Sequence, residues 1–415
     1  MTDPPPPPAP PPPPPGATPV DLGDPTARRY DLDALRGVAM LLGIVLHAAI
    51  PFVPYYGAGD VGGEILFGMF EYIHLWRMPL FFVISGFFTA MLWRRRGLRA
   101  LVRHRLRRVG LPLLIFYVPV IALILIGIIV GYSLAGDDLD DTFGQADAYE
   151  APADETEREP TGEEDGEEDE FGFAHLWFLW HLLWLVAVFA LIALGLERWQ
   201  ARGGRAPPAV LAWVLPPLSL VPFLSMQEDV LGPDTSDGIV PAPPVISFYA
   251  AFFFFGAVLY RDTPEPGPID RLGRVWPMQL IASLGLFGLL YGGVVDEGSM
   301  ALEVLAAWLV SFGMIGLFRT RLSEPSYRVR WLSDSSYWMY LMHLPLVFLF
   351  QGVAAGLGLP SIIAFVFIVV ATVAILAPTY HGLVRYTAIG RLLNGRRTRD
   401  GDARLRAQLD VLSRS

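Results

Sequence analysis

The sequence predicts an all-α membrane protein with about ten transmembrane helices and both termini in the cytoplasm. Of its 415 residues, 53% are hydrophobic and only 17% are charged, and the mean hydropathy is +0.43. A soluble domain has about a quarter charged residues and lacks long uncharged apolar runs. Such runs recur along most of this chain, so the sequence indicates a membrane-embedded helical protein.

Ten apolar segments are long enough to cross a hydrocarbon core, which takes about 20 helical residues. They cover residues 32–53, 70–92, 109–134, 173–196, 209–226, 244–260, 276–295, 300–318, 335–353 and 361–386. Arginines fall almost entirely in alternate loops, which the positive-inside rule assigns to the cytoplasm. The remaining loops contain one arginine, Arg158. This alternation predicts an even number of spans and a multi-pass protein of the cell inner (plasma) membrane.

Two low-complexity segments accompany the predicted transmembrane domain of residues 28–390. Residues 1–27 are rich in proline, which favours an extended, disordered cytoplasmic tail over a cleavable signal peptide. Residues 137–170 contain 17 acids and one arginine. This composition predicts a disordered extracytoplasmic loop, with weak binding of cations or of a cationic partner as the alternative. Residues 391–415 are expected to form a cytoplasmic C-terminal tail.

Missing residues and motifs exclude several functions. The chain has no cysteine, which excludes disulfides, thiolate catalysis and zinc–cysteine sites. The net charge of −10 comes from the acidic stretch, and the basic remainder forms no soluble domain, so no nucleic-acid partner is expected. Metalloprotease, Walker, nucleophile-elbow and dinucleotide-binding motifs are absent from the sequence. Any chemistry is therefore expected within the helices, without a metal.

Three ionisable residues, Asp33, Arg36 and His47, lie in the first predicted helix. Because a helix has about 3.6 residues per turn, Arg36 and His47 project from nearly the same face, with Asp33 close to it. A rise of about 1.5 Å per residue places His47 roughly 16 Å farther from the cytoplasmic surface than Arg36. A neutral imidazole suits general base catalysis. The alternative is a packed histidine bonded to a backbone carbonyl.

The second predicted helix contains the string HLWRMPLFFVISGFF, with His74, Arg77 and Ser85 on one side. Ionisable groups within hydrocarbon are costly and usually functional. Arg77 is expected to hold an acyl carboxylate or a sugar hydroxyl, and the alternative is snorkelling to lipid headgroups. Gly86 is expected to allow close approach of a neighbouring helix.

Eight arginines lie between residues 94 and 108, among them Arg103, Arg107 and Arg108. A guanidinium group binds phosphate bidentately, so this loop is a candidate site for a nucleotide-bearing donor. The alternative is a topogenic patch that binds the headgroups of membrane lipids. Both interpretations are compatible with one loop.

Two further histidines are secondary candidates for the site. His175 begins the string HLWFLWHLLW, whose tryptophans predict an interfacial aromatic belt, with stacking on sugar rings as the alternative. His343, in SSYWMYLMHLPL, is expected near mid-membrane. A packing role and a role in the site are both open for His343.

Together these strings resemble the acyltransferase-3 family over roughly residues 28–390. RRYDLDALRGVAMLLGIVLHA is similar to the opening helix of the family, and FFVISGFF with RHRLRRVGLPLL is similar to its second helix and the following loop. HLWFLWHLLW and SSYWMYLMHLPL resemble two further family segments. HLWRMPLFFVISGFF is similar to the branch that contains glucan succinyltransferases. The proline-rich and acidic stretches depart from the family pattern.

The resemblance implies an O-acyltransferase that moves an acyl group, such as acetyl or succinyl, from cytoplasmic acyl-CoA to a hydroxyl of an extracytoplasmic carbohydrate. It implies that His47 is the catalytic histidine, that Arg36 is the arginine of the first helix, and that Arg107 and Arg108 lie near the donor. Asp33 is expected to pair with Arg36 at the catalytic cavity, and Arg103 and Ser85 to extend the donor site. The remaining candidates are expected to bind the acceptor or the acyl group: His74, Arg77, His175 and His343. The alternative functions are a transporter or flippase for an anionic or acylated lipid, and a sensor or scaffold.

Overall fold

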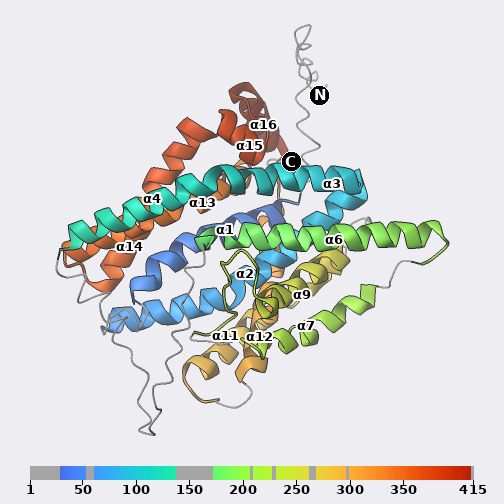
Figure 1. Ribbon diagram of the computed structural model, residues 1–415, viewed down its shortest axis with the longest axis horizontal. Helices are drawn as coiled ribbons and strands as arrows, with labels where there is room; N and C mark the ends of the chain where they lie inside the picture. The colour runs from blue at the N-terminus through green and yellow to red at the C-terminus, as the bar shows by residue number, and fades with distance from the viewer. Residues whose placement is uncertain are drawn as a thin grey trace, which may run out of the picture.

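The computed structural model describes residues 29–52, 60–136, 172–205, 209–226, 230–260, 268–295 and 299–412. Within these ranges all regular structure is helical, and the helices form one bundle (Figure 1). The prediction of an all-α membrane protein is therefore confirmed. The proline-rich segment 1–27 and the acidic segment 137–170 lie outside the described residues.

The described part of the first half of the bundle contains eight α-helices, two of them only four residues long, and several short turns. The α-helices are α1 (Tyr30–Ala49), α2 (Val61–Arg96), α3 (Leu98–Arg105), α4 (Leu111–Ala135), α6 (Trp177–Ala201), α7 (Leu215–Leu218), α8 (Leu220–Phe223) and α9 (Pro243–Leu259). The 3-10 turns are η2 (Ile50–Phe52), η6 (Ala174–Leu176) and η7 (Ala209–Val214). A π-helical turn, η4 (Leu106–Gly110), joins α3 to α4 into one continuous rod.

The second half ends in two helices that follow the last apolar segment. The helices are α10 (Pro268–Leu272), α11 (Trp276–Tyr291), α12 (Ser299–Leu322), α13 (Tyr327–Gly356), α14 (Ser361–Thr379), α15 (Ala388–Asn394) and α16 (Arg399–Leu412), with the π-helical turn η8 (Tyr380–Val384) after α14. Helices α15 and α16 each contact α13 and lie at the edge of the bundle (Figure 1).

Seven of the ten predicted spans are long and apolar enough to cross a membrane. These helical segments are Tyr30–Phe52, Val61–Arg96, Leu98–Ala135, Ala174–Ala201, Ser299–Leu322, Tyr327–Gly356 and Ser361–Val384. The other three predicted spans coincide with shorter apolar helices, Val210–Phe223, Pro243–Leu259 and Trp276–Tyr291. Each apolar segment predicted from the sequence is thus helical, although three are shorter than the length expected of a full span.

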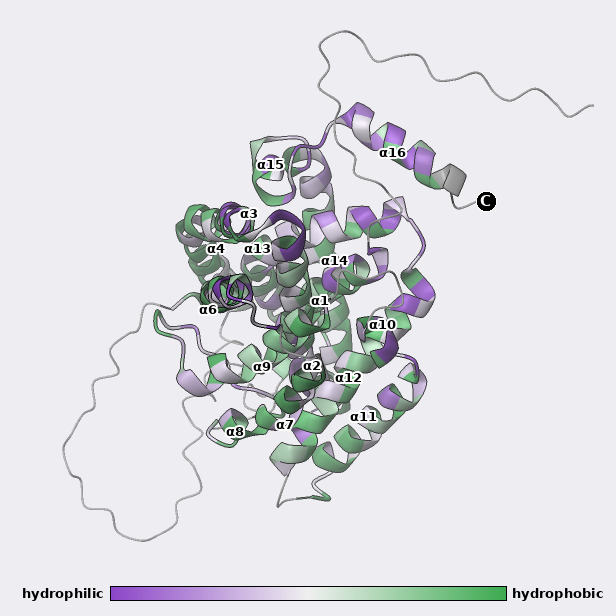
Figure 2. Cartoon of the chain, turned by 90° about the vertical axis from the view of Figure 1, so that its right-hand side faces the viewer, coloured by the Kyte–Doolittle hydropathy of each residue, from purple (hydrophilic) through white to green (hydrophobic). Residues whose placement is uncertain are grey.

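Burial separates the central helices from the peripheral ones. Of an 18-residue apolar stretch in each helix, 78% of the residues are buried in α2, 28% in the rod of α3 and α4, and 22% in α14 with η8. Large apolar side chains on the outer faces of the peripheral helices are exposed, such as Leu114, Ile129 and Val370. Hydrophobic residues dominate the helices in the middle of the bundle, while hydrophilic residues gather on α3 and α16 (Figure 2). The apolar outer faces are the ones that suit lipid contact.

Helix α2 is delimited by a side-chain cap and by a glycine. The Asp60 carboxylate accepts a hydrogen bond from the Gly63 N–H at 2.6 Å and caps the first turn. The same carboxylate oxygen accepts a hydrogen bond from the Ser361 hydroxyl at the start of α14, at 2.7 Å. At the other end, Gly97 has a φ of 78° and donates its N–H to the Trp93 carbonyl, which stops the helix before α3.

Glycines bring α2 into backbone contact with α9. A Cβ atom at Gly86 would overlap the Phe253 carbonyl, and a Cβ at Gly256 would overlap the Val83 carbonyl. Small residues at such a crossing let two helix backbones approach closely within a membrane. The close approach predicted for Gly86 is therefore confirmed, and it fixes α2 in the centre of the bundle.

Replacing Gly86 by alanine is expected to destabilise the folded protein, because the added methyl group has no space at this crossing. Overpacking a tight contact typically costs about 1–3 kcal/mol or more. The fraction of detergent-solubilised protein that remains monodisperse after heating measures the effect. Gly195→Ala is the matched control, since a Cβ there meets nothing within 4 Å. Equal thermal stability of the two variants would contradict the assignment.

Candidate active site

Three histidines from distant parts of the chain meet inside the bundle. His47 lies near the end of α1, His175 in η6 and His343 in the middle of α13. The ring centroids are 5.2 Å apart for His47 and His343, 5.0 Å for His175 and His343, and 6.5 Å for His47 and His175. The structure thus brings together three of the histidines singled out in the sequence, and we call them the histidine cluster.

Backbone carbonyls orient the rings of the histidine cluster. His343 Nδ1 donates to the Tyr340 carbonyl at 2.7 Å, and His175 Nε2 donates to the Leu341 carbonyl at 3.3 Å. The Tyr340 hydroxyl donates to the His175 carbonyl at 2.7 Å. The other ring nitrogens of His175 and His343 are buried and have no hydrogen-bond partner among the described residues. When these rings are neutral, each therefore keeps a lone pair that is available to a substrate proton.

Arg77 projects from α2 into the same region. The side chain is buried, and its Nε atom has no hydrogen-bond partner in the part of the chain that the structure describes. A Cβ atom at Gly43 of α1 would lie 2.8 Å from Arg77 Nη1 and 3.8 Å from His343 Nε2. The guanidinium therefore lies over Gly43, beside the histidine cluster. No carboxylate within the described ranges forms an ion pair with it. An uncompensated buried charge is costly, so this position favours an anionic or electron-rich ligand.

His74 lies one turn before Arg77 on α2 and contacts the segment that precedes α9. Its Nδ1 atom donates to the Leu231 carbonyl at 3.1 Å, and its ring stacks on Phe70 at 5.7 Å between centroids. The Leu231 N–H in turn donates to Glu71 at 3.1 Å. His74 thus borders the site where a connecting segment covers the end of α2.

A cavity of about 600 Å³ opens at the arginine-rich end of the bundle. Seven arginines and three aspartates line it: Arg29, Arg36, Arg95, Arg96, Arg105, Arg108 and Arg397, with Asp33, Asp270 and Asp334. Its inner wall is apolar and includes Met40, Phe81 and Phe178. A cavity with a cationic mouth and an apolar inner end suits an amphipathic molecule whose anionic groups lie at one end.

Two of the four residues predicted for the donor site, Ser85 and Arg108, line the cavity. Asp33 and Arg36, which were predicted as catalytic residues, line it as well. Arg36 is held by the Ser333 hydroxyl at 2.9 Å and by Asp33 at 3.5 Å, which is the pairing expected from the sequence.

The other two predicted donor residues, Arg103 and Arg107, are exposed and do not line the cavity. Sequence reasoning missed Arg105, which turns inward between them. Its Nη2 atom donates to the Thr89 hydroxyl at 2.6 Å and to the Ser85 carbonyl at 3.4 Å. The signal that could have found Arg105 is its position four residues after the apolar Leu101, on the buried face of α3.

Aromatic rings connect the cavity to the histidine cluster. Phe178 lines the cavity and packs edge-on against Phe81, with 4.5 Å between centroids. Phe178 also contacts Tyr340 at 6.3 Å, and the Tyr340 ring lies 5.6 Å from that of His175 and 6.2 Å from that of His343. A molecule that reached from the cavity to the histidine cluster would therefore pass these rings.

The fold and the site define a membrane-embedded protein whose polar groups converge inside a helix bundle. Residues 29–381 match the acyltransferase domain of the acyltransferase-3 family, and the chain belongs to this family. Similar proteins include those named glucans biosynthesis protein C from Salmonella schwarzengrund, Salmonella typhi and Salmonella typhimurium. Each is 27% identical over 345 residues, which cover 79% of this chain and 84% of the relative.

No solved structure matches the chain. The resemblance inferred from the sequence motifs is confirmed by the family match, and the chain is a multi-pass membrane acyltransferase.

The Gly43→Ala variant is expected to fold and to lose activity, because the added methyl group displaces only the flexible end of Arg77. Misplacing a positioned group by about 1 Å can lower a rate roughly 100-fold. Acyl transfer by the purified variant in liposomes measures the effect. Gly285→Ala serves as the control, since its Cβ meets nothing within 4 Å. Full activity of Gly43→Ala would show that the position of Arg77 is irrelevant to transfer.

Proposed function

We propose that the chain transfers an acyl group from acyl-CoA in the cytoplasm to a carbohydrate hydroxyl on the other side of the inner membrane. The observation that supports this most directly is the position of two sites along α1. Arg36 lines the arginine-rich cavity, and His47 belongs to the histidine cluster about 16 Å farther along the helix. Acyl-CoA has phosphates at one end and a thioester at the other, joined by a long pantetheine arm.

The cationic mouth of the cavity suits the phosphates of CoA. Arg105 and Arg108 bond only to hydroxyl and carbonyl oxygens among the described residues, so their charges are not neutralised by carboxylates. Guanidinium groups bind phosphate oxygens through paired, charge-assisted hydrogen bonds. The apolar inner wall at Met40 and Phe178 suits the pantetheine arm. The donor would thus lie with its thioester directed toward the histidine cluster.

His47 is proposed as the general base for the acceptor. It takes the proton of the acceptor hydroxyl while the oxygen attacks the thioester carbonyl. The tetrahedral intermediate collapses with cleavage of the carbon–sulfur bond, and the CoA thiolate leaves and recovers a proton from His47. A second route, in which His47 first accepts the acyl group, forms and breaks the same bonds in two steps. Arg77 lies where it can stabilise the oxyanion or hold a carboxylate of the acyl group.

The acceptor is proposed to be a glucan or a similar envelope carbohydrate. The supporting relatives are named for glucan biosynthesis, and the acyltransferase domain accounts for most of the chain. His74 and Arg77 would orient this acceptor at the end of the site that is remote from the arginine-rich cavity. Acetyl and succinyl are the two acyl groups that we propose to test first.

The His47→Ala variant is expected to lower CoA release about 10²- to 10⁴-fold, which is the usual contribution of a general base. Release of free CoA from acetyl-CoA or succinyl-CoA, by protein in liposomes supplied with envelope glucans, measures the effect. His381→Ala is the matched control, because that histidine is exposed and remote in sequence from the cluster. Unchanged turnover in His47→Ala would refute the mechanism. Lipid or glycan movement by the wild type without any CoA release would favour a flippase.

The Arg77→Gln variant is expected to lower succinyl transfer more than acetyl transfer if the guanidinium holds the free carboxylate of the acyl group. A hydrogen bond to a charged group contributes about 1.5–3 kcal/mol, which corresponds to a selective loss of roughly 10- to 100-fold. The ratio of kcat/KM for the two donors measures the selectivity. An equal loss for both donors would instead assign Arg77 to the oxyanion or to the acceptor.

A further inference from the structure

The chain from residue 385 onward lies beyond the acyltransferase match, which ends at residue 381, yet it forms part of the cavity wall. Leu393 and Asn394, at the end of α15, and Arg397, between α15 and α16, all line the cavity. The sequence predicts that residues 391–415 form a cytoplasmic C-terminal tail. Contacts of Arg108, Arg397 and Arg385 hold this segment at the arginine-rich cavity.

The end of α15 holds Arg108, one of the proposed donor-binding residues. Arg108 Nη1 donates to the Arg391 carbonyl at 3.1 Å and to the Leu392 carbonyl at 3.0 Å. The last carbonyls of a helix have no partner within the helix and present a negative dipole end, so they favour a cation. Gly395, with a φ of 88°, ends α15 directly beside this guanidinium. The direction of Arg108 thus depends on α15.

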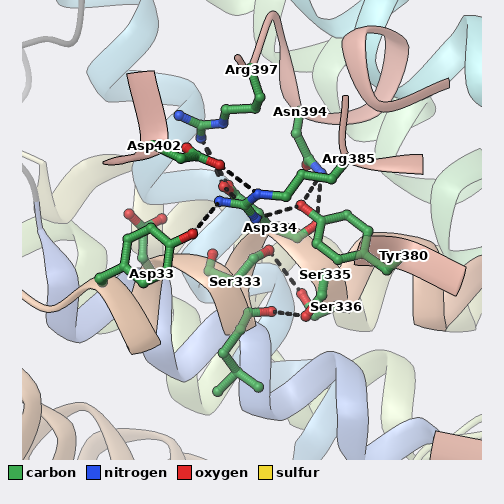
Figure 3. Close-up of polar contacts among 12 residues, drawn as sticks. Asp33, Ser333, Asp334, Ser335, Ser336, Tyr380, Arg385, Asn394, Arg397 and Asp402 are labelled. Atoms are coloured by element: carbon green, nitrogen blue, oxygen red, sulfur yellow. Dashed lines mark hydrogen bonds and ion pairs between the residues drawn. The ribbon is translucent and has the colours of Figure 1, made fainter. Parts of the chain in front are cut away.

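Arg397 is fixed against α13 on the same wall. Its Nη2 atom lies 3.0 Å from Oδ1 and 2.9 Å from Oδ2 of Asp334, as Figure 3 shows. Asn394 Nδ2 donates to the Asp334 carbonyl at 2.7 Å. The Nε atom of Arg397 is buried and has no partner. Asp334 follows Ser333, whose hydroxyl binds Arg36. One turn of α13 therefore holds both Arg36 and Arg397 in the cavity wall.

Helix α16 is anchored to the bundle by a buried arginine. Arg385 is 1% exposed, and its Nε atom donates to Asp402 of α16 at 2.7 Å. The Tyr386 hydroxyl donates to the same carboxylate at 3.0 Å. Leu405 and Leu409, on the face of α16 that contains Asp402, are 1% and 2% exposed. These contacts hold α16 on the bundle, and with it the link that contains Arg397 (Figure 3).

We propose that the C-terminal segment, residues 385–412, is part of the donor-binding site. Arg397 contributes a guanidinium to the phosphate-bearing end of the donor, and α15 positions Arg108 beside it. Asp402 and Arg385 are positioning residues that hold the segment in place. The proposal rests on the acyl-CoA-dependent transfer proposed above. It adds a binding element that lies outside the region shared with the acyltransferase domain.

The test compares two donors that share the thioester and differ in the phosphates. Arg397→Gln is measured with acetyl-CoA and with S-acetyl-pantetheine, which contains no phosphate. We expect KM for acetyl-CoA to rise about tenfold or more, consistent with the loss of a charge-assisted contact. We expect kcat, and turnover of S-acetyl-pantetheine, to stay as in the wild type. Arg397→Lys, which keeps the charge, is expected to restore part of the affinity.

Arg404→Gln is the matched control, because this arginine is exposed on α16 and outside the cavity lining. It is expected to leave KM for both donors unchanged. Wild-type KM for acetyl-CoA in the folded Arg397→Gln variant would overturn the inference while the proposed function stands. Absence of acetyl-CoA turnover in the wild type would overturn the proposed function itself.

A second measurement follows the docking of α16 directly. In the Asp402→Ala variant, trypsin is expected to cleave at Arg404 and Arg406 faster than in the wild type, and KM for acetyl-CoA is expected to rise. Free CoA is expected to slow cleavage of wild-type α16, since donor and docked segment stabilise each other. Cleavage of the wild-type helix at the same rate with and without CoA would contradict the coupling.

Discussion

The close packing of α1 against α13 and α2 is the constraint on which both the arginine-rich cavity and the histidine cluster depend. At Gly37, a Cβ atom would lie 3.2 Å from Ser333 Cα of α13, and at Gly43 it would lie 2.8 Å from Arg77 of α2. The first glycine lets Arg36 bond to Ser333, and the second leaves space for the guanidinium beside His343. Larger residues on this face of α1 would push α13 and α2 away from it. Arg36 would then lie farther from Ser333, and Arg77 farther from His343.

The helical segments and part of the site could be predicted from sequence because lipid imposes simple rules. Long apolar runs must form helices to satisfy their backbone hydrogen bonds, and ionisable residues within them face the interior. These rules located α1 and α2 and singled out His47, Arg77 and His343. They did not predict that His175 approaches from a 3-10 turn, because the convergence of distant segments depends on packing.

The arginine-rich loop shows how far the donor residues could be predicted. Arg103 and Arg105 both lie in α3, where residues two apart project about 200° from each other, so Arg105 lines the cavity and Arg103 is exposed. The π-helical turn η4 interrupts the helical phase after Arg105, so periodicity counted from α3 does not place Arg107 and Arg108. The contacts of the C-terminal segment could not be predicted for a different reason. Its docking depends on single pairs such as Arg385 with Asp402, which leave no periodic pattern in the sequence.

The Asp60 cap has a consequence for the response of the fold to acid. Hydrogen bonds from the Ser361 hydroxyl and then from the Gly63 N–H lower the pKa of the Asp60 carboxyl below its usual value. A carboxylate with a lowered pKa stabilises the folded state above its ordinary pKa and loses that contribution as the pH falls through the lowered value. The same oxygen joins the start of α2 to the start of α14. Protonation of one exposed side chain would therefore loosen two helix starts together, at the end of α2 opposite the arginine-rich cavity.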